Sequence, residues 1–465
     1  MSFVDRFANT YKKLLPSPFT IALLLTALTF VLALIFTKPI DAGYGEYTLT
    51  LAGKWEEALW LEGKGGLYFA FQMMLMLILG HILALSKPVA FLIDRLTQPC
   101  TNTANTALIV TLSTMLVSLF NWGLGLIFGA ILARKVGEKF NRENRSLNYP
   151  LIGAAAYSGL MVWHGGISGS APIKAAENGN LKKILADVEG VDLATIPDSI
   201  DMSQTIFSGM NITISLMLLI LVPLMMFYFG KRKQSQGILP TPSVLKNEDE
   251  QLKPEGAEKL DHSKFLAILV GILILCYAFY KAVILPEKLS LGFLTPNFIN
   301  FSLLGLGIAF HLSISNFIKA AGEAISGATG ILLQFPLYFG ILGLMIGSGL
   351  INEISDFFVS VSSENSFPIY TFFSAGLVNV FVPSGGGQWA VQGPIIIASA
   401  QELGVSFSKS IMALSYGDQL TNMIQPFWAL PLLGITGLKA KEILPYTLLL
   451  FLAGGFIFLV GLLLF

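Results

Sequence analysis

Apolar runs long enough to cross a lipid bilayer recur along almost the whole of this chain. A helix needs about 20 apolar residues to span roughly 30 Å of hydrocarbon. Of the 465 residues, 54% are hydrophobic and 12% are charged, whereas a soluble domain carries about 25% charged residues. Helices satisfy their own backbone hydrogen bonds in lipid. We therefore expect an all-α polytopic membrane protein.

The hydropathy pattern predicts about nine transmembrane helices. Their expected bounds are 17–37, 67–86, 148–164, 205–229, 265–285, 298–318, 328–350, 408–428 and 443–464. Two further apolar regions, about 103–133 and 369–402, are each too long for one span and are broken in the middle. We interpret both as re-entrant helical hairpins, which enter and leave the membrane on the same side.

The break in the second hairpin is the clearest of the chain. Residues 382–389 read Val-Pro-Ser-Gly-Gly-Gly-Gln-Trp, and three glycines with a proline cannot continue a helix. Breaks of this kind hold the solute in transporters, and the start of the returning half-helix favours an anion such as a carboxylate. Close packing of helices is the alternative role of the glycines. The candidate substrate-binding residues here are Ser384, Gly385, Gly386, Gly387 and Gln388.

Basic residues in the loops set the expected orientation. Lys and Arg are concentrated in the N-terminus, in 134–145, at the start of 231–264 and at 439–441, so these parts are expected in the cytoplasm. The acid-rich stretch 172–204 is expected outside. All of these loops lie on their expected sides if the first hairpin enters the membrane from the cytoplasmic side and the second from the external side.

The order of elements is repeated in the two parts of the chain. Residues 1–230 form the first half, 231–264 a cytoplasmic linker, and 265–465 a linking helix followed by the second half. Each half contains a span, a broken hairpin, and a span with a polar interruption that begins at Tyr157 or Tyr416. Because the halves have opposite orientation, we expect an inverted-topology repeat, whose interface usually houses the solute.

Polar residues at membrane depth supply the other candidates. Asn121, followed by Trp122 and Gly123, breaks the first hairpin, and an unpaired Asn in lipid costs free energy. These three residues are expected to bind substrate, although closing the hairpin tip is an equally good role for Asn121. Asn422 completes the predicted substrate site.

Asp418 lies inside an otherwise apolar span, and an intramembrane carboxylate is a functional hypothesis by default. Helical spacing puts Thr421, Asn422 and Gln425 on its face. Asp418, with His164 and Asn379, is the predicted ion-coupling group, and a proton or a sodium ion is the candidate ion. A structural pair with His81 or His311 is the alternative for Asp418, and ordinary packing is the alternative for His164.

An enzymatic function must also be weighed. Residues 166–169 fit the pattern G-x-S-G, and an intramembrane serine protease would need His81 or His311 beside Ser168. Such an enzyme would leave the second hairpin unexplained. The chain has no H-E-x-x-H and no P-loop, and its 29 basic and 29 acidic residues balance. We expect no enzyme, no metal site, no cofactor and no nucleic-acid partner.

The segments that begin at Asn121, His164, Val382 and Tyr416 closely resemble the bacterial short-chain fatty acid transporter family. They read Asn-Trp-Gly-Leu-Gly-Leu-Ile-Phe-Gly-Ala, His-Gly-Gly-Ile-Ser-Gly-Ser-Ala-Pro, Val-Pro-Ser-Gly-Gly-Gly-Gln-Trp-Ala-Val-Gln-Gly-Pro and Tyr-Gly-Asp-Gln-Leu-Thr-Asn-Met-Ile-Gln-Pro-Phe-Trp. The resemblance covers essentially the whole chain. It implies an ion-coupled carrier with inverted repeats, a substrate such as butyrate or acetoacetate, a bacterial inner membrane, and a homodimer with elevator-type movement.

Together these features predict an ion-coupled secondary transporter of short-chain monocarboxylates. The carboxylate is expected between the hairpin tips, and its alkyl tail on Trp122, Trp163 and Trp389. A cation/proton antiporter on the same scaffold is the alternative, and a serine protease is a weaker one.

Overall fold

The computed structural model describes residues 16–60, 66–186, 191–232, 239–240, 256–285, 293 and 296–465. These residues form helices and turns with no strand among them, so the all-α expectation is confirmed. The basic N-terminus and most of the linker 231–264 lie outside the described residues. Within the described part, five helical runs are long and apolar enough to cross a membrane: Pro18–Phe36, Thr103–Phe120, Gly209–Gly230, Lys264–Ile284 and Ala440–Leu464.

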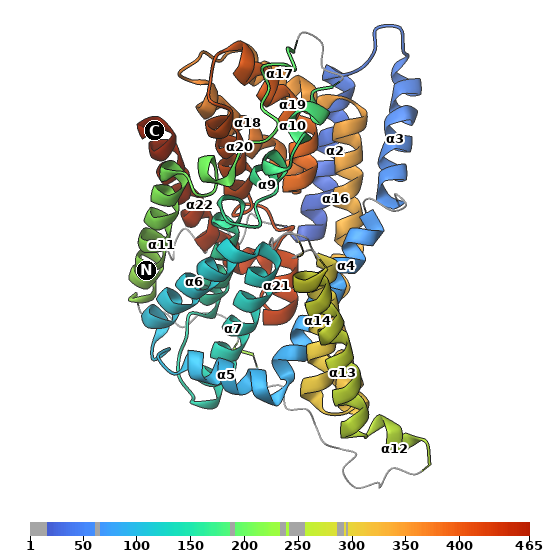
Figure 1. Cartoon of the computed structure of the whole chain (residues 1–465), viewed down its shortest axis with the longest axis vertical. Helices are drawn as coiled ribbons and strands as arrows, with labels where there is room; N and C mark the ends of the chain where they lie inside the picture. The colour runs from blue at the N-terminus through green and yellow to red at the C-terminus, as the bar shows by residue number, and fades with distance from the viewer. Residues whose placement is uncertain are drawn as a thin grey trace.

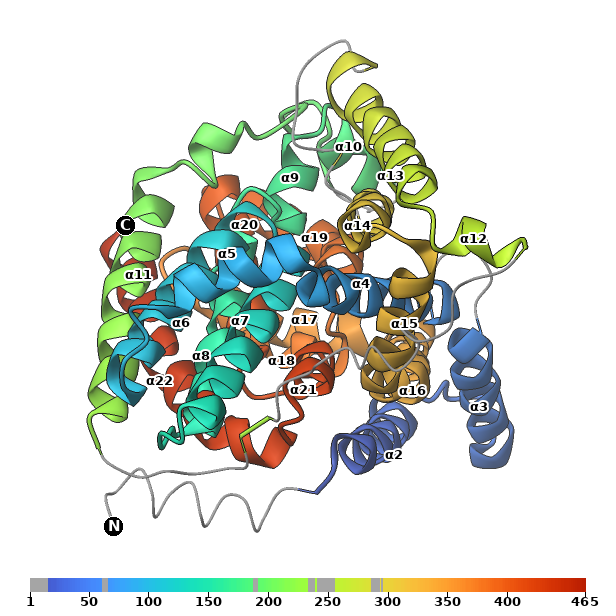
Figure 2. The ribbon, with the colours of Figure 1, turned by 90° about the horizontal axis from the view of Figure 1, so that it is seen from below.

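The helices form two groups that lie side by side (Figures 1 and 2). The first contains α2 (Pro18–Phe36), α3 (Tyr44–Trp60), α4 (Gly66–Leu85), α13 (Lys264–Phe279), α14 (Pro296–His311), α15 (Ile314–Ala324) and α16 (Thr329–Gly347). The second contains α6 (Thr103–Phe120), α7 (Trp122–Arg142), α8 (Tyr149–Tyr157), α9 (Ser170–Ala176), α11 (Gly209–Gly230), α18 (Phe367–Phe381), α19 (Gly385–Glu402), α20 (Phe407–Thr421), α21 (Ala429–Thr436) and α22 (Ala440–Leu464). The short helices α5 (Lys87–Thr97) and α17 (Leu350–Ser360) connect the groups, and α10 (Asn180–Ile184) and α12 (Glu258–Asp261) lie in loops.

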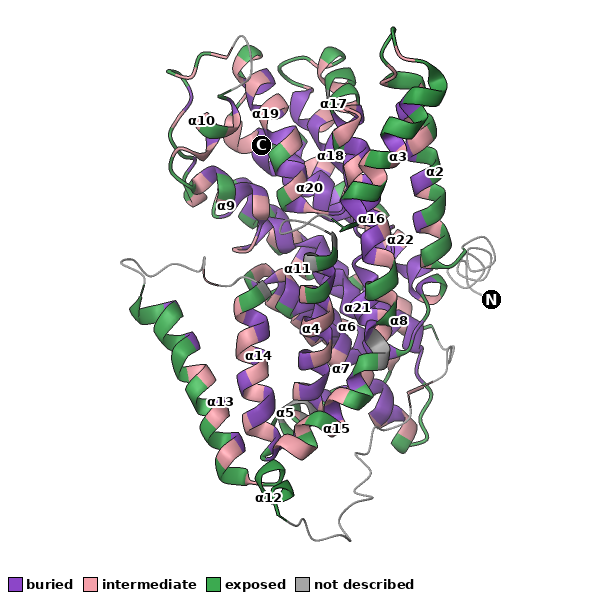
Figure 3. Cartoon of the chain, turned by 90° about the vertical axis from the view of Figure 1, so that its right-hand side faces the viewer, coloured by how far each residue is buried: buried purple, intermediate pink, exposed green. Residues whose placement is uncertain are grey.

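Both predicted hairpins are present as pairs of helices. Hairpin 1 is α6 and α7 with Asn121 between them, and hairpin 2 is α18 and α19 with residues 382–384 between them. Hairpin 1 lies in the lower half of the molecule and hairpin 2 in the upper half, in both side views (Figures 1 and 3). The two breaks therefore face the middle of the protein from opposite ends.

Hairpin 1 is longer than the sequence indicated. The basic stretch 134–145 was expected as a loop, but α7 continues to Arg142. Glu138 accounts for the difference, since its carboxylate pairs with Arg134 at 3.0 Å and with Lys135 at 2.9 Å along the helix. Pairs at these spacings stabilise a helix.

Three predicted spans are not continuous helices. The span 148–164 is α8 followed by two 3₁₀ turns, Ser158–Met161 and Trp163–Gly165. The span 298–318 is interrupted at Leu312, whose φ of 59° is left-handed, before α15 begins. The span 408–428 leaves the helix after Thr421. The first and third breaks lie at the polar interruptions that the sequence indicated after Tyr157 and Tyr416, whereas the break at Leu312 was not expected.

The outer faces of the bundle are apolar, as expected for a surface that meets lipid. Leu24 on α2, Ile220 on α11 and Leu273 on α13 are all more than half exposed. The buried residues gather along the middle of the molecule, where the two hairpins approach each other (Figure 3).

A cover segment, residues 170–186 and 191–200, packs on hairpin 2. Its apolar side chains join those of α19 in one buried cluster, which includes Leu181, Leu185, Ile196, Ile200, Trp389, Ile396 and Ile397. Gln401 at the end of α19 donates to the Asp192 carbonyl at 3.0 Å. These contacts fasten the cover segment to the end of hairpin 2 that is remote from its break.

Candidate functional site at the hairpin tips

Asn121 forms the tip of hairpin 1 by capping both of its helices. Its backbone N–H donates to the Val117 carbonyl at 2.9 Å, which ends α6. Its side-chain Oδ1 accepts from the Leu124 N–H at 2.9 Å, which starts α7. The side chain is buried, so its structural role in closing the tip is plain, and its contact with substrate stays a prediction.

Hairpin 1 docks on the glycine-rich segment 163–170. The Trp122 N–H donates to Ser168 Oγ at 3.0 Å, and the Ile167 N–H donates to the Leu119 carbonyl at 2.9 Å. A Cβ added at Gly166 would lie 2.3 Å from the Leu119 carbonyl oxygen. Glycine is therefore required there, because the two backbones meet directly.

Ser168 does not have the surroundings of a nucleophile. Its hydroxyl oxygen accepts a backbone hydrogen bond at the tip of hairpin 1. His311, one proposed base, is bonded through Nε2 to the Ile82 carbonyl at 2.8 Å, in the other group of helices. His81 lies on α4 in that group as well.

The tip of hairpin 2 presents the start of α19. Ser384 caps this helix, since its Oγ accepts from the Gly387 N–H at 3.2 Å and its carbonyl accepts from the Gln388 N–H at 2.7 Å. The first N–H groups of a helix, here those of Gly385 and Gly386, have no acceptor within the helix. They are the natural donors for an anion at this tip.

Gln388 lies between the two helices of hairpin 2 rather than at its tip. Its Nε2 donates to the Ala375 carbonyl at 2.8 Å and to Gln392 Oε1 at 2.7 Å. Gln392 in turn donates to Ser374 Oγ at 3.1 Å. This buried amide ladder holds α18 and α19 together.

Gly385 brings hairpin 2 onto the same segment that receives hairpin 1. A Cβ added at Gly385 would lie 2.8 Å from Trp163 Cη2, 2.9 Å from His164 Cε1 and 3.3 Å from Ser170 Oγ. Residues 163–170 are thus contacted by both tips. The sequence predicted that the two tips face each other around a pocket. In the structure, both tips contact the short segment 163–170.

His164 and Asp418, two of the predicted ion-coupling residues, are partners. His164 Nδ1 lies 2.5 Å from Asp418 Oδ2, and both side chains are buried. His164 Nε2 accepts from the Ala171 N–H at 3.0 Å. The backbone N–H of His164 donates to Gln419 Oε1 at 2.9 Å. Asp418 is therefore paired neither with His81 nor with His311.

Asn379, the third predicted ion-coupling residue, ties hairpin 2 to the end of α20. Its Nδ2 donates to the Asp418 carbonyl at 2.7 Å, to Thr421 Oγ1 at 2.9 Å and to Asn422 Oδ1 at 3.0 Å. Gln425 Nε2 donates to the Asn379 carbonyl at 3.2 Å. The polar residues converge as expected, although the helix ends at Thr421, so Asn422 and Gln425 reach Asn379 from a turn and not from one helical face.

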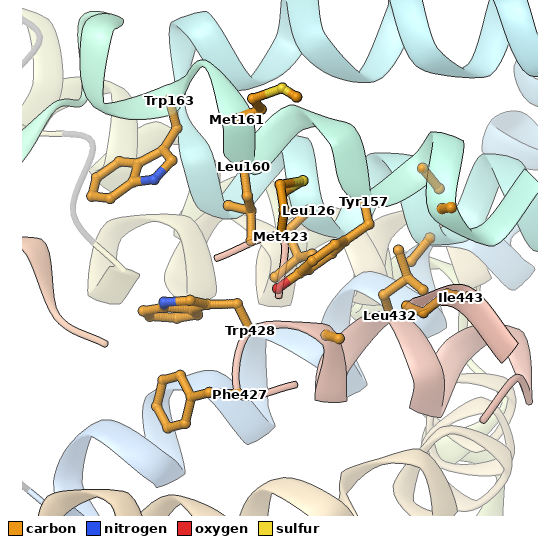
Figure 4. Close-up of a cluster of buried hydrophobic side chains, with 14 of the residues drawn as sticks. Leu126, Tyr157, Leu160, Met161, Trp163, Met423, Phe427, Trp428, Leu432 and Ile443 are labelled. Carbon is orange, nitrogen blue, oxygen red and sulfur yellow. The ribbon is translucent and has the colours of Figure 1, made fainter. Parts of the chain in front are cut away.

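Three tryptophans form an aromatic cluster beside the pair. The ring centroids of Trp122 lie 6.2 Å from Trp163 and 5.0 Å from Trp428, and Trp163 stacks on His164 at 4.4 Å. Figure 4 shows Trp163 and Trp428 facing each other, with Phe427 beyond. The buried Trp163 Nε1 donates to no residue that the structure describes.

Trp389 was expected to line the same surface, and the structure places it elsewhere. Its Nε1 lies 3.4 Å from Asn180 Oδ1, and its ring packs with the cover segment. The reason is the helical turn after Ser384, which points position 389 away from the tip. Trp428, which the sequence did not single out, takes the place in the cluster.

A small cavity lies between the hairpin 2 tip and α16. Val382, Pro383 and Ser384 face Tyr338 on α16 and, with Phe339, Leu342 and Phe427, line a cavity of about 10 Å³. A single water molecule needs about 10–15 Å³. A carboxylate with an alkyl tail therefore does not fit in this cavity.

Asn211 is a residue of the site that sequence reasoning missed. Its Nδ2 donates to the Gly165 carbonyl at 2.8 Å, and its Oδ1 accepts from the Tyr416 hydroxyl at 3.0 Å. Both side chains are buried. A lone Asn in the first turn of an apolar span was the available signal, since a polar side chain in lipid requires partners.

The chain matches known proteins over its full length. A family model described as "Short chain fatty acid transporter" matches residues 2–465. Two proteins named "Putative short-chain fatty acid transporter" are similar to it: that of Escherichia coli (strain K12) is 36% identical, over 100% of this chain and 98% of the relative. That of Haemophilus influenzae is 37% identical, over 99% of each.

Two solved transporters also align with the structure. The Alcanivorax borkumensis YdaH transporter has 17% identity and a TM-score of 0.42, with 97% of each chain covered. Neisseria gonorrhoeae MtrF has 15% identity and a TM-score of 0.39, with 99% of this chain and 96% of that one covered. Both scores are too low for anything to follow about this chain.

Proposed function

Because the chain belongs to the short-chain fatty acid transporter family, we propose that it is an ion-coupled secondary carrier of short-chain fatty acids or related small monocarboxylates, of the butyrate or acetoacetate class. The family consists of transporters, so the chain is a multi-pass membrane transport protein and not an enzyme. The bacterial inner membrane is its proposed location.

The observation that carries this proposal is the meeting of both hairpin tips on residues 163–170. At this point Gly385, whose N–H has no acceptor within α19, lies beside Trp163, and the buried indole N–H of Trp163 has no acceptor among the described residues. Donors without acceptors suit a carboxylate. The rings of Trp122 and Trp428 offer apolar surface for a short alkyl tail.

The arrangement also supports an ion-coupled mechanism. The buried Asp418 carboxylate is bonded to the His164 ring, and the next residue, Gln419, accepts from the His164 N–H. His164 in turn contacts Gly385 at the hairpin 2 tip. An ion bound at Asp418 and a carboxylate bound at the tip would therefore lie close enough to influence each other. This proximity is what a coupled carrier needs, since coupling is a free energy shared by two sites.

Orientation, repeat and assembly belong to the same proposal. Hairpin 1 and hairpin 2 face the middle from opposite ends (Figure 1), which supports an inverted repeat with 1–230 and 265–465 as its halves. The positive-inside rule supports a cytoplasmic N-terminus. Assembly as a homodimer follows from the family resemblance.

The direct test is uptake of labelled butyrate or acetoacetate into proteoliposomes, with pH and Na⁺ gradients imposed separately. Saturable uptake, absent from protein-free vesicles, is expected. Counterflow, in which unlabelled acid inside the vesicle drives entry of labelled acid, reports transport without any ion gradient. Movement of Na⁺ or H⁺ with no organic acid present would instead favour the cation/proton antiporter.

A further inference from the structure

The pair of His164 and Asp418 has one free acceptor atom. His164 Nε2 accepts from the Ala171 N–H at 3.0 Å, so the single ring proton of a neutral imidazole lies on Nδ1. Nδ1 then donates this proton to Asp418 Oδ2 at 2.5 Å. Asp418 Oδ1 accepts no hydrogen bond from any described residue. A second proton on the ring would break the Ala171 bond, whereas a proton on Oδ1 breaks none.

The pair is buried and would carry a net charge when Asp418 is ionised. With a neutral imidazole, an ionised Asp418 would leave one net negative charge on two side chains that are 0% and 1% exposed. Removing an uncompensated carboxylate from water is costly. One proton bound at Asp418 Oδ1 removes this charge.

The elements packed around the pair bring no compensating cation to it. Tyr157 and Tyr416 are uncharged and donate their hydroxyl hydrogens elsewhere. The other titratable side chains on the surrounding helices lie away from the pair. Lys409 is in the first turn of α20, nine residues before Asp418, and Lys174 on α9 pairs with the exposed Glu177. The rest are Tyr370 and Glu402 at the remote ends of hairpin 2, Tyr228 at the far end of α11, and Lys441, Glu442 and Tyr446 in the first turns of α22. Helix α6 carries none.

We propose that the coupling ion is a proton, carried on Asp418 Oδ1, and that His164 is the positioning residue that holds the carboxyl group. This inference rests on the proposed function. On one side of the membrane an O–H bond forms at Oδ1, and on the other side the same bond breaks and the proton leaves to water. One proton and one carboxylate anion cross together, so the step carries no net charge.

Hairpin 2 links this proton to the substrate. The Gly385 backbone lies directly on the His164 ring, so a substrate carboxylate at the start of α19 would be close to Asp418. Two carboxylates in a site of low dielectric repel each other strongly. Protonation of Asp418 removes this repulsion. The acid therefore binds best to the protonated carrier, which is the condition for symport.

Sodium is the competing ion that an experiment must separate. Asn379 Oδ1 and Gln425 Oε1 are also buried without a hydrogen-bond partner among the described residues. Oxygen atoms of this kind are ligands for hard cations. A proton needs only one oxygen without a hydrogen bond. Asp418 Oδ1 is such an atom, because His164 occupies the other carboxylate oxygen, Oδ2.

The test compares two modes of transport in proteoliposomes with sodium-free buffers. Protonated short-chain acids cross lipid unaided, so uptake by protein-free vesicles at the same pH gradient is subtracted. For the wild type, an inward proton gradient is expected to accelerate uptake by roughly tenfold, within the usual range of coupling between two sites. Counterflow at equal pH gives the rate of exchange without net proton movement.

Asp418→Asn and His164→Asn separate the two residues. An asparagine at 418 imitates the protonated carboxyl group and still accepts from His164, so counterflow is expected to persist while the gradient effect disappears. An asparagine at 164 retains a donor near the position of Nδ1 but cannot titrate. It is expected to keep the gradient effect, with a shifted pH midpoint. Asp418→Glu, which keeps a titrating carboxyl, is expected to retain gradient-driven uptake at a reduced rate.

Each contrary result has a distinct meaning. Uptake that follows a sodium gradient and ignores the pH gradient would overturn the proton as coupling ion. Loss of the gradient effect in His164→Asn together with its retention in Asp418→Asn would place the proton on the imidazole and overturn the role of Asp418. Absence of saturable counterflow for every short-chain acid with the wild type would instead remove the proposed function itself.

Discussion

Tyr157 and Tyr416 each donate a hydrogen bond to a residue in the other half of the chain. Tyr157, on α8, donates its hydroxyl hydrogen to the Asn422 carbonyl at 3.0 Å. Tyr416, on α20, donates to Asn211 Oδ1, also at 3.0 Å. The two tyrosines begin the polar interruptions of the first and second halves. One acceptor is a backbone carbonyl and the other a side-chain oxygen, and each tyrosine hydroxyl fixes a residue of the other half of the chain.

Replacing Tyr416 by Phe is expected to destabilise the protein. The Asn211 oxygen would remain buried without its donor, and an unsatisfied buried acceptor costs about 1–3 kcal/mol. Thermal unfolding in detergent measures the loss. Tyr277→Phe is the matched control, because Tyr277 is 58% exposed on α13. Equal unfolding temperatures for the two variants would contradict the structural role of the Tyr416 hydroxyl.

Gly385→Ala is expected to slow transport without unfolding the protein. The added methyl group would lie 2.8 Å from Trp163 and 2.9 Å from His164, so the tip of hairpin 2 could not close. Uptake should fall on the order of tenfold or more, since a misplacement of about 1 Å in a site can cost a hundredfold. Gly322→Ala on α15, where a Cβ meets nothing within 4 Å, should leave uptake unchanged. Wild-type uptake by Gly385→Ala would show that the observed contact is not part of the cycle.

Trp163→Phe tests the indole N–H as a carboxylate donor. The nitrogen bonds to none of the described residues, so its removal should change stability little and raise the KM for the acid, by roughly tenfold for one charge-assisted hydrogen bond of about 1.5 kcal/mol. Trp389→Phe is the control, because its nitrogen faces Asn180 in the cover segment. An unchanged KM in Trp163→Phe would take this nitrogen out of the substrate site.

Glu138→Gln should be the most destabilising of these changes. Its side chain is 5% exposed and lies between Arg134 and Lys135, so two partly buried cations would lose their partner, at a cost on the order of 3 kcal/mol. Arg134 also donates to the Ile435 carbonyl at 2.8 Å, which joins hairpin 1 to α21. Glu143→Gln, which affects a pair that is about 40% exposed, should cost under about 1 kcal/mol. Thermal unfolding of both variants decides the comparison.

The hairpins could be found from the sequence because their signals are local. Asn121 and the run from Pro383 to Gly387 interrupt apolar stretches, and such interruptions have few structural explanations in lipid. The amphipathic helices α5 and α17 were missed, since their charged residues and short length resemble loops in a hydropathy profile. The extension of α7 was missed for the same reason.

The pairing of His164 with Asp418 could not be predicted from local sequence signals. His164 and Asp418 are 254 positions apart, and each had several possible partners by composition. Packing of the 3₁₀ turns after α8 against α20 decides which one is used. Likewise, nothing in the sequence distinguishes Trp428 from Trp389 as a member of the aromatic cluster, because the direction of a side chain depends on where its helix begins.

The cover segment offers an exposed site on hairpin 2 that lies away from its tip. Leu181, Leu185, Ile196 and Ile200 share one buried apolar cluster with α19, so any displacement of hairpin 2 would have to include the segment. An antibody fragment that binds the segment would therefore restrain hairpin 2 without contacting the proposed substrate site.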